Sequence, residues 1–563
     1  MNDYKELKTP FEEDLTSSPY PRPQLKRDSF LSLSGEWDLY VRGEREEYLG
    51  KIIVPYPPES RISGICRELK PSESYIYRKS FFVENDFFVS RTLLHFGAVD
   101  QRARVTLNGV TYPDNVGGYL PFTYDVTDSV RVGENTLEVE VTDTLDKTLG
   151  YGKQTRKSSG MWYTAISGIW QEVWLESVAD RYIKSVSFTP TLDSVDITVD
   201  GGLCEKTLLF DGREYAFEGD SFTLEIESPI CWTPENPHLY SIVITDGVDR
   251  VESYFALRTV DIREIKGRMR LCLNGKPYFF HGLLDQGYWS DGIFTPASDK
   301  GYLFDILEMK KQGFNTLRKH IKIEPDIFYY YCDKYGMAVF QDMVNSGEYS
   351  FIRDTALPTL GFKKAVREGA EKKRLEAFLS DSIDTLSLLY NHPSVVYYTI
   401  FNEGWGQFDA DGVYEVLKRL DPTRIFDTAS GWFKPCVSDV DSEHIYFKKI
   451  KLKCCKRPLV LSEFGGYSCR IDSHVFNESK TYGYGKCRDT EELTRRLEDV
   501  YLKEIIPLID EGLSASILTQ LSDIEDEING LVTYDRQVVK TDALRMKAIA
   551  DEINKHIKAL QGE

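Results

Sequence analysis

The segment VVYYTIFNEGW (residues 395–405) decides how the second half of the chain is interpreted. It opens with an unbroken run of β-branched and aromatic residues, which is typical of a strand buried on both faces of a parallel sheet. The run ends at Asn402 and Glu403, and Gly404 follows. The segment therefore predicts a buried strand whose last residues are polar.

Seven similar runs lie on either side of this segment, between residues 263 and 563. They are YFFHGLL (278–284), NTLRKH (315–320), AVFQDM (338–343), IFDTAS (425–430), EHIY (443–446), LVLSEFGG (459–466) and ASILTQLSD (515–523). An intervening helix is clear, because its apolar residues fall on one face: Leu375, Phe378, Leu379, Ile383, Leu386 and Leu389. Eight strands alternating with helices predict a (β/α)8 barrel over residues 263–563.

The chain upstream of the barrel consists of short strands separated by turns. In residues 1–178 these are WDLYV, IIVPY, YIYRKSFFV, RTLLHFG, ARVTLNG, NTLEVEV and GIWQEVWLE, and Asn108-Gly109 signals a hairpin. Residues 179–262 continue with ITVDGG, TLLFDGREYAF, SFTLEIE, YSIVITDG and SYFALRTVDI. We expect a jelly-roll sandwich followed by an immunoglobulin-like sandwich.

Polar side chains end most of the barrel runs, where such folds place their active sites. They are Asp285, Arg318, His320, Asp342, Asn402, Glu403, His444, Tyr446, Glu463 and Gln520. Glu403 and Glu463 end strongly apolar strands, and burial tends to raise a carboxyl pKa. Such a pair is what glycoside cleavage requires, since one carboxyl protonates the leaving oxygen and the other attacks the anomeric carbon. Alternatively, either glutamate caps a helix or satisfies a loop.

The chain resembles glycoside hydrolase family 2, the group of β-galactosidases, β-glucuronidases and β-mannosidases, from about residue 30 to 545. The motifs that carry the resemblance are LSGEWDLY, VPYPPES, LHFGAVDQRARVTLNG, GGYLPF, SGIWQEVWLE, TPENPHLY, ALRTVDI, LNGKPYFFHG, GFNTLRKH, NHPSVVYYTIFNE, LDPTR, SGW, LSEFGG and NGLVTYDR. The resemblance implies a retaining exo-β-glycosidase, β-galactosidase first. A non-catalytic carbohydrate-binding protein on the same scaffold is the alternative, because fold alone does not settle activity.

The family's functional residues can be placed on this sequence through those motifs. Glu403 in FNEGW matches the acid/base, and Glu463 in LSEFGG matches the nucleophile. Asn402 matches the residue that hydrogen-bonds the sugar 2-hydroxyl. Tyr446 resembles the tyrosine that supports the nucleophile, or else fills the barrel core. Arg318 resembles an arginine that orients the nucleophile.

Four further residues are candidate sugar contacts. Trp432, in SGW, is a candidate stacking wall, and Trp162, in the loop 152–164, either stacks on a sugar or packs between domains. His320 and Asp285 end strands that depart from the family pattern, since the second strand reads Arg-Lys-His where R-x-x-H is frequent and the first ends in Asp-Gln-Gly where Arg-His-Glu is common.

The loop after the last strand bears on the charge of the sugar. Family β-glucuronidases hold the substrate carboxylate there with an Asn-x-Lys pair, whereas this chain has SDIEDEINGLVTYDR (522–536) without a lysine. Its acidic residues would repel a carboxylate and accept hydrogen bonds from sugar hydroxyls. We therefore expect a neutral sugar, unless the acidic residues face solvent or Lys319, Lys322 or Arg156 supplies a cation.

Composition excludes several other classes. A formal net charge of −20 over 563 residues, with no basic stripe to offset it, argues against nucleic-acid binding. The first residues lack a signal-peptide core and no apolar run is long enough to span a bilayer, so a cytoplasmic protein without membrane contact is expected. Ten scattered cysteines suggest free, mostly buried thiols. No metal or cofactor is predicted, and a homo-oligomer is left open.

Overall fold

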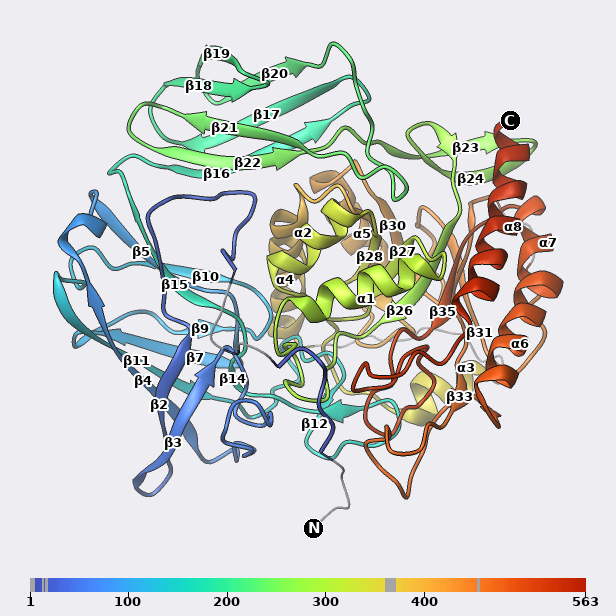
Figure 1. The fold of residues 1–563 in the computed structure, drawn as a ribbon, viewed down its shortest axis with the longest axis horizontal. Helices are drawn as coiled ribbons and strands as arrows, with labels where there is room; N and C mark the ends of the chain where they lie inside the picture. Colours follow the sequence, from blue (N-terminus) through green and yellow to red (C-terminus); the bar gives the residue numbers. More distant parts are fainter. Residues whose placement is uncertain (1–5, 13–14, 16–18, 360–370, 453–455, 563) are drawn as a thin grey trace.

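We describe the fold from a computed structural model, which describes residues 6–12, 15, 19–359, 371–452 and 456–562. Figure 1 shows two β-sandwiches, drawn in blue to cyan and in green, beside a helix-wrapped barrel drawn from yellow-green to red. The barrel and the first of the two sandwiches both contribute residues to the site described below.

The first sandwich packs two mostly antiparallel sheets over a shared core. One has the order β1 (Phe30–Ser32), β15 (Val173–Val178), β5 (Arg91–Phe96) and β10 (Phe122–Asp125). The other has the order β3 (Glu46–Val54), β2 (Gly35–Arg42), β4 (Ser74–Val83), β11 (Gly133–Thr142), β7 (Arg102–Leu107) and β8 (Val110–Thr111), with β9 (Asn115–Val116) also paired to β7. Asn108 and Gly109, with φ of 50° and 86°, form the predicted hairpin turn between β7 and β8.

Short ladders extend this sandwich toward the barrel. Strand β14 (Gly168–Ile169) pairs with β6 (Val99–Asp100), and β12 (Gln154–Thr155) pairs with β13 (Tyr163–Thr164). The last two strands hold the loop 152–164, which the sequence singled out as reaching over the barrel. They fix the base of that loop, so its side chains have defined positions.

The second sandwich also has two sheets. They are β16 (Ile183–Pro190), β17 (Ser194–Gly201) and β20 (Ser221–Glu225), and β19 (Arg213–Glu218), β18 (Glu205–Phe210), β21 (Tyr240–Thr245) and β22 (Arg250–Phe255). The alternating burial of β17 shows one face directed into the core. A small sheet of β23 (Val260–Ile265), β24 (Arg268–Leu273) and β25 (Lys276–Pro277) follows, and β23 crosses the predicted domain boundary at residue 262.

The barrel contains all eight predicted strands as one parallel sheet. Its order is β30 (Ile425–Ser430), β29 (Val395–Asn402), β28 (Ala338–Asp342), β27 (Thr316–Lys319), β26 (Phe280–Asp285), β35 (Leu513–Thr519), β32 (Leu459–Gly465) and β31 (Asp441–Ile445). Strands β30 and β31 lie against each other and nearly close the barrel. Leu271 of β24 packs with the apolar residues of its interior.

The helices around the barrel depart from the predicted alternation. They are α1 (Lys300–Lys311), α2 (Asp326–Tyr335), η2 (Ile352–Ala356), α3 (Leu357–Thr359), α4 (Lys372–Leu389), α5 (Ala410–Leu420), α6 (Thr490–Val500), η3 (Tyr501–Ile505), α7 (Ile506–Asp510) and α8 (Ala543–Gln561). Helix α4 is the helix predicted from its apolar spacing. However, no helix joins β30 to β31, or β31 to β32 in the described part of that connection, so full alternation was wrong there. Loops occupy these places, and both border the site.

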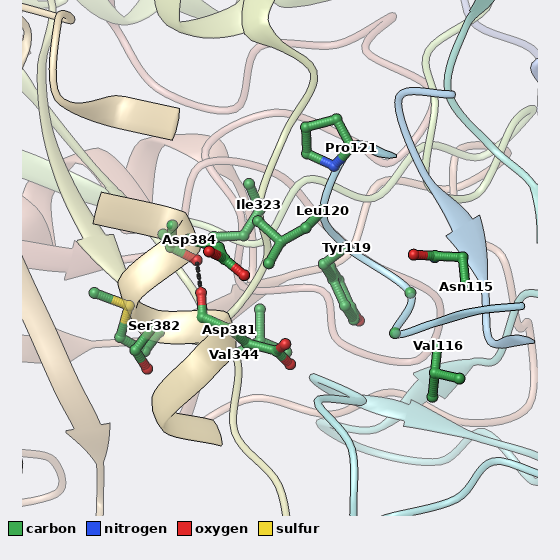
Figure 2. Close-up of a pocket in the computed structure, with 14 residues that line it drawn as sticks. Asn115, Val116, Tyr119, Leu120, Pro121, Ile323, Val344, Asp381, Ser382 and Asp384 are labelled. Carbon is green, nitrogen blue, oxygen red and sulfur yellow. Dashed lines mark hydrogen bonds between the residues drawn. The ribbon is translucent and has the colours of Figure 1, made fainter. Parts of the chain in front are cut away.

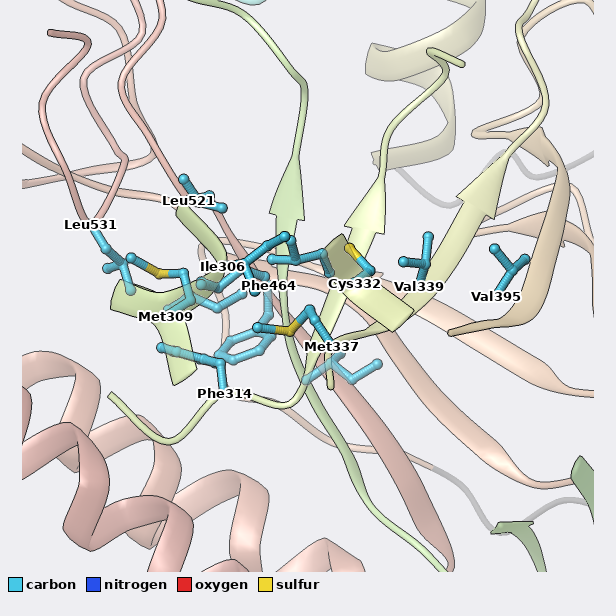
Figure 3. Packing of buried hydrophobic residues seen from close by; sticks show 14 of the residues in the cluster. Ile306, Met309, Phe314, Cys332, Met337, Val339, Val395, Phe464, Leu521 and Leu531 are labelled. Atoms are coloured by element: carbon cyan, nitrogen blue, oxygen red, sulfur yellow. The ribbon is translucent and has the colours of Figure 1, made fainter. Parts of the chain in front are cut away.

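The barrel core explains why these strands and helices stay together. Figure 3 shows Ile306 and Met309 of α1, Val339 of β28, Val395 of β29 and Phe464 of β32 among the buried side chains of one cluster between sheet and helices. Each fully buried aliphatic or aromatic side chain contributes about 1.5–3 kcal/mol to folding. Rigid strand ends follow from this packing, because the interior tolerates little rearrangement.

The burial of the cysteines and the length of the helices bear on two further predictions. Among the eight cysteines in the described ranges all are free, but Cys66, Cys204 and Cys436 are exposed, so the expectation of mostly buried thiols holds only for Cys272, Cys332, Cys469 and Cys487. Cys454 and Cys455 lie outside the described residues. None of the described helices is both long and apolar enough to pass through a bilayer.

Candidate active site

The backbone around Glu403 turns sharply where its strand ends. Strand β29 ends at Asn402, and Glu403 and Gly404 then have φ of 51° and 73°. Left-handed conformation is unfavourable for a residue with a side chain and is found at functional sites that packing holds in place. Glu463 lies within β32, on the opposite side of the sheet order. Both carboxyl groups are buried, with 7% and 6% of the two residues exposed.

The two carboxyl groups face each other, with His444 of β31 between them. One oxygen of Glu403, one oxygen of Glu463 and one ring nitrogen of His444 all lie within 4.8 Å of one another. His444 Nδ1 is 2.8 Å from Glu403 Oε1 and 3.4 Å from Glu463 Oε2. One oxygen of each carboxyl group thus lies within 4.8 Å of the other, which favours the short spacing of retaining enzymes over the wider spacing that admits a water.

Arg318 of β27 anchors the Glu463 side. Its Nη1 donates to Glu463 Oε1 at 3.0 Å, and its Nη2 donates to Asn402 Oδ1 at 2.9 Å. Asp342, at the end of β28, accepts from Arg318 Nε at 3.0 Å. Removing one partner of such a buried pair costs about 3–5 kcal/mol, because the other charge stays buried without compensation. Glu463 and Asn402 are thus held by the same guanidinium group.

Tyr446 supports Glu463 from the other side. Its hydroxyl donates to Glu463 Oε2 at 2.7 Å and lies 2.8 Å from Thr519 Oγ1 at the end of β35. Both oxygens of Glu463 therefore have a donor, one from Arg318 and one from Tyr446. A carboxylate held in this way keeps one orientation, with its charge favoured over the protonated form.

The two carboxyl groups have opposite pKa shifts. Burial raises the pKa of Glu403 above its ordinary value, and the charge of Glu463 adds to this, although the hydrogen bond from His444 opposes it. Burial acts in the same direction on Glu463, but the nearby positive charges of His444 and Arg318 outweigh it and bring its pKa to about 2. At neutral pH Glu463 is ionised, while Glu403 is the carboxyl that keeps a proton more readily.

The position of His444 depends on its neighbours. Its Nδ1 faces Glu403 at 2.8 Å, and its Nε2 lies 3.4 Å from Arg318 Nη1, so the ring is held between the carboxyl group and the guanidinium group. Gly431, with φ of 78°, makes this approach possible, because a Cβ there would lie 2.9 Å from His444 Cγ. The glycine of the SGW motif is therefore needed for the packing of His444.

The remaining predicted contacts divide into two groups. Trp432 lines the cleft over Glu403, and its Nε1 donates to the Asp354 carbonyl at 3.1 Å. His320 lies beside this network, with Nδ1 2.8 Å from Asp342 Oδ2, and burial lowers its pKa to about 4. Asp285 is instead held by Lys319 Nζ at 2.7 Å in a separate buried ion pair.

Trp162 belongs to an aromatic cluster that joins the first sandwich to the barrel. Its ring stacks on Trp405 at 5.5 Å between centroids and is tilted against Tyr349 at 4.8 Å. It is not among the residues that line the cleft, whereas its neighbour Met161 is. The arrangement favours the interdomain packing alternative for Trp162.

The acidic loop after β35 is buried, so its residues do not face solvent. Asp523, Glu525, Asp526 and Glu527 are each at most 8% exposed. Glu527 accepts hydrogen bonds from the Tyr163 hydroxyl and, at 2.9 Å, from Asn529 Nδ2. Burial raises its pKa, which also responds to Lys153 and Glu463. Tyr163, which donates to Glu527, also has its ring centre 5.7 Å from Lys153 Nζ, so Glu527 and Lys153 share a neighbour.

Lys153 is a site residue that the sequence reasoning missed. It belongs to the loop 152–164, is 7% exposed, and its Nζ lies 5.7 Å from the ring centres of both Tyr163 and Trp405. Burial lowers its pKa, while Glu527, Glu463 and Glu403 act to raise it. In the described ranges no carboxylate forms an ion pair with it within 4.0 Å. The first sandwich thus supplies a buried cation to the barrel mouth.

A cleft of about 850 Å³ opens from Glu403, His444 and Tyr446 to the surface. A second, smaller cavity of about 120 Å³ lies between the loop 115–121 of the first sandwich and helix α4, where Figure 2 shows Tyr119 and Leu120 facing Asp381. Burial raises the pKa of Asp381 to about 6, but neither Glu403 nor Glu463 lines this cavity. The larger cleft is therefore the candidate active site.

A metal ion could bind in the described part of the chain only at one group of His, Cys, Asp and Glu side chains, namely Glu403, His444 and Glu463. The guanidinium group of Arg318 already contacts Glu463 at 3.0 Å and supplies positive charge there. A metal ion at this position would occupy both carboxyl groups that glycoside cleavage requires. The residues therefore do not fit a resident metal that coexists with this chemistry.

Comparisons with known proteins agree with this architecture. Residues 264–464 match the glycosyl hydrolases family 2 TIM barrel domain, and residues 67–170 match the glycosyl hydrolase 2 galactose-binding domain-like family. A β-galactosidase of Klebsiella pneumoniae is 25% identical over 410 residues, which are 65% of this chain and 36% of that protein. The chain spans about a third of the length of the first curated relatives it matches.

Two solved structures share the fold over nearly their whole length. A β-D-glucuronidase of Dictyoglomus thermophilum is 20% identical with a TM-score of 0.76, covering 95% of this chain and 98% of that chain. A β-galacturonidase of Eisenbergiella tayi is 18% identical with a TM-score of 0.68, covering 96% and 98%.

Proposed function

Since the chain belongs to glycoside hydrolase family 2, we propose that it is a retaining exo-β-glycosidase that removes a terminal β-linked sugar. The observation that carries this proposal is the pair Glu403 and Glu463, which face each other across His444 and have opposite pKa shifts. A protonated and an ionised carboxyl group at short separation are what double displacement requires.

Each step uses a group that is already in place. Glu463 attacks the anomeric carbon as its carboxylate, while Glu403 donates a proton to the departing glycosidic oxygen. A covalent glycosyl-enzyme forms on Glu463. Glu403 then accepts a proton from water, and the resulting hydroxide attacks the same carbon and releases Glu463. Asn402, whose Oδ1 is held by Arg318, can donate from its amide nitrogen to a sugar hydroxyl.

The carboxyl separation supports retention of configuration. Retaining enzymes hold the two carboxyl groups about 5–5.5 Å apart, and inverting enzymes about 6.5–9.5 Å apart. One oxygen of Glu403 and one oxygen of Glu463 lie within 4.8 Å of each other, which agrees with the spacing of retaining enzymes. Proton NMR of the first product anomer tests this directly: we expect the β-anomer first, and initial release of the α-anomer would contradict the mechanism.

For the sugar we propose a neutral hexoside or pentoside, with galactoside first. Glu527 is buried, the charge of Glu463 contributes to its raised pKa, and its carboxylate can accept hydrogen bonds from sugar hydroxyls. A carboxylate on the sugar would instead meet the charge of Glu527 in a poorly solvated place.

Lys153 favours a second candidate, a β-uronide. Its ammonium group is buried 5.7 Å from the ring centre of Tyr163, whose hydroxyl donates to Glu527, and forms no ion pair with a described carboxylate, so a substrate carboxylate could bind there. The related solved structures include a β-D-glucuronidase and a β-galacturonidase, but at 20% and 18% identity they show the shared fold and leave the sugar open.

A panel of p-nitrophenyl glycosides separates the two candidates. We expect higher kcat/KM on the β-galactoside than on the β-glucuronide or β-galacturonide. Lys153→Met should lower activity on a uronide about 100-fold if that ammonium binds the carboxylate, since charged hydrogen bonds contribute about 1.5–3 kcal/mol. Lys147→Met is the matched control, because Lys147 belongs to the adjoining segment and pairs with Glu348 at 2.8 Å. If the enzyme preferred the uronide and Lys153→Met abolished that preference, the substrate would be a uronide and the proposal of a neutral sugar would be wrong.

A further inference from the structure

The outer wall of the cleft has a charge opposite to that of the whole chain. Residues 446–457 contain six lysines and arginines and no aspartate or glutamate, whereas the chain carries a net charge of −20. This segment follows β31, in the connection where the described residues form a loop in place of a helix. Its first residues directly follow the carboxyl end of β31, the end of the barrel strands at which barrel enzymes bind substrate.

Three lysines of this segment line the cleft, while the nearby Glu504 carboxylate accepts from the Ile450 backbone N–H at 2.7 Å. Lys448, Lys449 and Lys451 line the cleft and are exposed, and within the described ranges no ion pair joins them to an acidic residue. The two glutamates that line the cleft are engaged elsewhere, since Glu403 contacts His444 at 2.8 Å and Glu443 contacts Lys434 at 2.9 Å. The cleft therefore has an excess of positive charge on its outer side.

Aromatic rings lead from the reaction centre to these lysines. Tyr446, which contacts Glu463, stacks on Tyr484 at 4.2 Å, and Phe447 meets Tyr484 edge-on at 5.3 Å. Phe447 is 78% exposed with φ of 59°, and Phe351, which also lines the cleft, is 63% exposed. The two exposed rings line the same cleft, and exposed apolar side chains that gather in one place mark binding sites.

We propose that this outer wall binds an anionic aglycone, namely a saccharide that carries carboxylate or sulfate groups. The inference rests on the proposed glycosidase function and names the leaving group of that same site. The ring of the sugar next to the cleaved bond packs against Phe447, because the C–H faces of sugars pack on aromatic rings. Its acidic groups, or those of the following residue, pair with Lys448, Lys449 and Lys451.

Charge complementarity carries the choice of an anion over a neutral saccharide. Exposed lysines interact weakly one at a time, but three on one wall of a cleft raise the local concentration of anions. They act against the repulsion that a chain of net charge −20 exerts on an anionic substrate. The wall thus permits an acidic substrate to reach a site that the rest of the surface disfavours.

The experiment compares three disaccharides that share the non-reducing sugar identified by the p-nitrophenyl panel. Their reducing-end residue is glucose, glucuronic acid or glucose 6-sulfate. We expect kcat/KM about tenfold higher for the two anionic substrates at low salt, and a preference that shrinks as salt screens the lysines. A preference for one anion alone would identify the carboxylate or the sulfate as the group recognised.

Variants then locate the preference on the wall. Replacing Lys448, Lys449 and Lys451 together by serine should bring the ratio of anionic to neutral kcat/KM close to one, and replacing them by glutamate should invert it. Serine at Lys184, Lys555 and Lys558, three exposed lysines that do not line the cleft, is the matched control and should leave the ratio unchanged. Thermal unfolding checks that each variant is folded.

Two negative results have separate meanings. Equal kcat/KM on all three disaccharides, with normal turnover of the p-nitrophenyl glycoside, would overturn the anionic aglycone and leave the glycosidase function standing. No turnover of any glycoside would contradict the proposed function itself.

Discussion

The floor and the outer wall of the cleft are built in opposite ways. On the floor, Glu463 has both oxygens hydrogen-bonded, and Arg318 behind it is fully buried. On the outer wall, Phe447 is 78% exposed, and Lys448 and Lys449 are exposed beside it. A fully hydrogen-bonded floor suits a reaction that depends on geometry fixed in advance, whereas an exposed wall suits recognition of a variable group.

The largest expected effect comes from the floor. Glu463→Ala should reduce kcat by about 10⁵-fold, because in the proposed mechanism no other group forms the covalent intermediate. The measurement is kcat on an aryl glycoside with a good leaving group, after thermal unfolding has shown that the variant is folded. The matched control is Glu443→Ala, which removes a carboxyl group that lines the same cleft but pairs with Lys434. If both variants lost kcat to a similar extent, Glu463 on the floor would be no more important for the reaction than Glu443, which lines the same cleft.

Glu403→Ala should have a smaller effect that depends on the leaving group. Loss of a general acid costs about 10²–10⁴-fold where the leaving oxygen needs a proton, and much less for an activated aryl leaving group. Measuring kcat/KM on a disaccharide and on a dinitrophenyl glycoside gives the two values. Azide should restore turnover and yield a β-glycosyl azide, since it attacks the glycosyl-enzyme without base assistance. Equal loss on both substrates would show that Glu403 is not the acid.

His444 lies between the two carboxyl groups, so its removal should change the pH profile more than the rate. Its hydrogen bond lowers the pKa of Glu403, and its charge lowers the pKa of Glu463. In His444→Phe both pKa values should rise. The alkaline limb of kcat/KM, where Glu403 loses its proton, and the acid limb, where Glu463 gains one, should then both move to higher pH. The rate at the optimum should fall about tenfold, as one hydrogen bond is lost.

The control for this profile is His474→Gln, which changes a partly exposed histidine that pairs with Asp535. It should leave both limbs in place. Limbs that stay fixed in His444→Phe would show that His444 only fills space between the carboxyl groups.

Sequence reasoning predicted the eight barrel strands because their apolar runs are long and their ends are marked by polar residues. It named Glu403, Glu463, Asn402, Arg318 and Tyr446 as site candidates, and in the structure these five belong to one hydrogen-bonded group. The catalytic roles of these residues remain predictions. Asp285 was predicted to contact the sugar, but in the structure it pairs with Lys319 of the neighbouring strand. No pattern in the sequence around Asp285 indicates this pairing.

The missed residues share a physical reason. Lys153 lies in a loop of another domain, and its approach to Trp405 of the barrel depends on how the first sandwich packs on the barrel, which no local pattern encodes. His444 was visible at a strand end, but its role depends on the curvature that brings β31 opposite β29. No helix forms in the described parts of the connections after β30 and β31. These connections are short, residues 431–440 and 446–458, and the first contains both a glycine and a proline, a signal that the alternation rule overrode.

The smallest expected effect concerns the outer wall and separates stability from binding. Phe447 adopts φ of 59°, a left-handed conformation that costs a residue with a side chain about 1–2 kcal/mol relative to glycine. Its ring is mostly exposed, so its removal forfeits little packing. Phe447→Gly should therefore unfold at a higher temperature than Phe447→Ala, which keeps the strain and loses the same ring. Both variants should lower kcat/KM about threefold on disaccharides, where the ring contacts the second sugar, and less on a small aryl glycoside. Because alanine and glycine differ only in a methyl group, the comparison between them isolates the backbone. If alanine proved as stable as glycine, the left-handed backbone would carry no strain, and the contrast between a strained, exposed wall and a packed floor would rest on side chains alone.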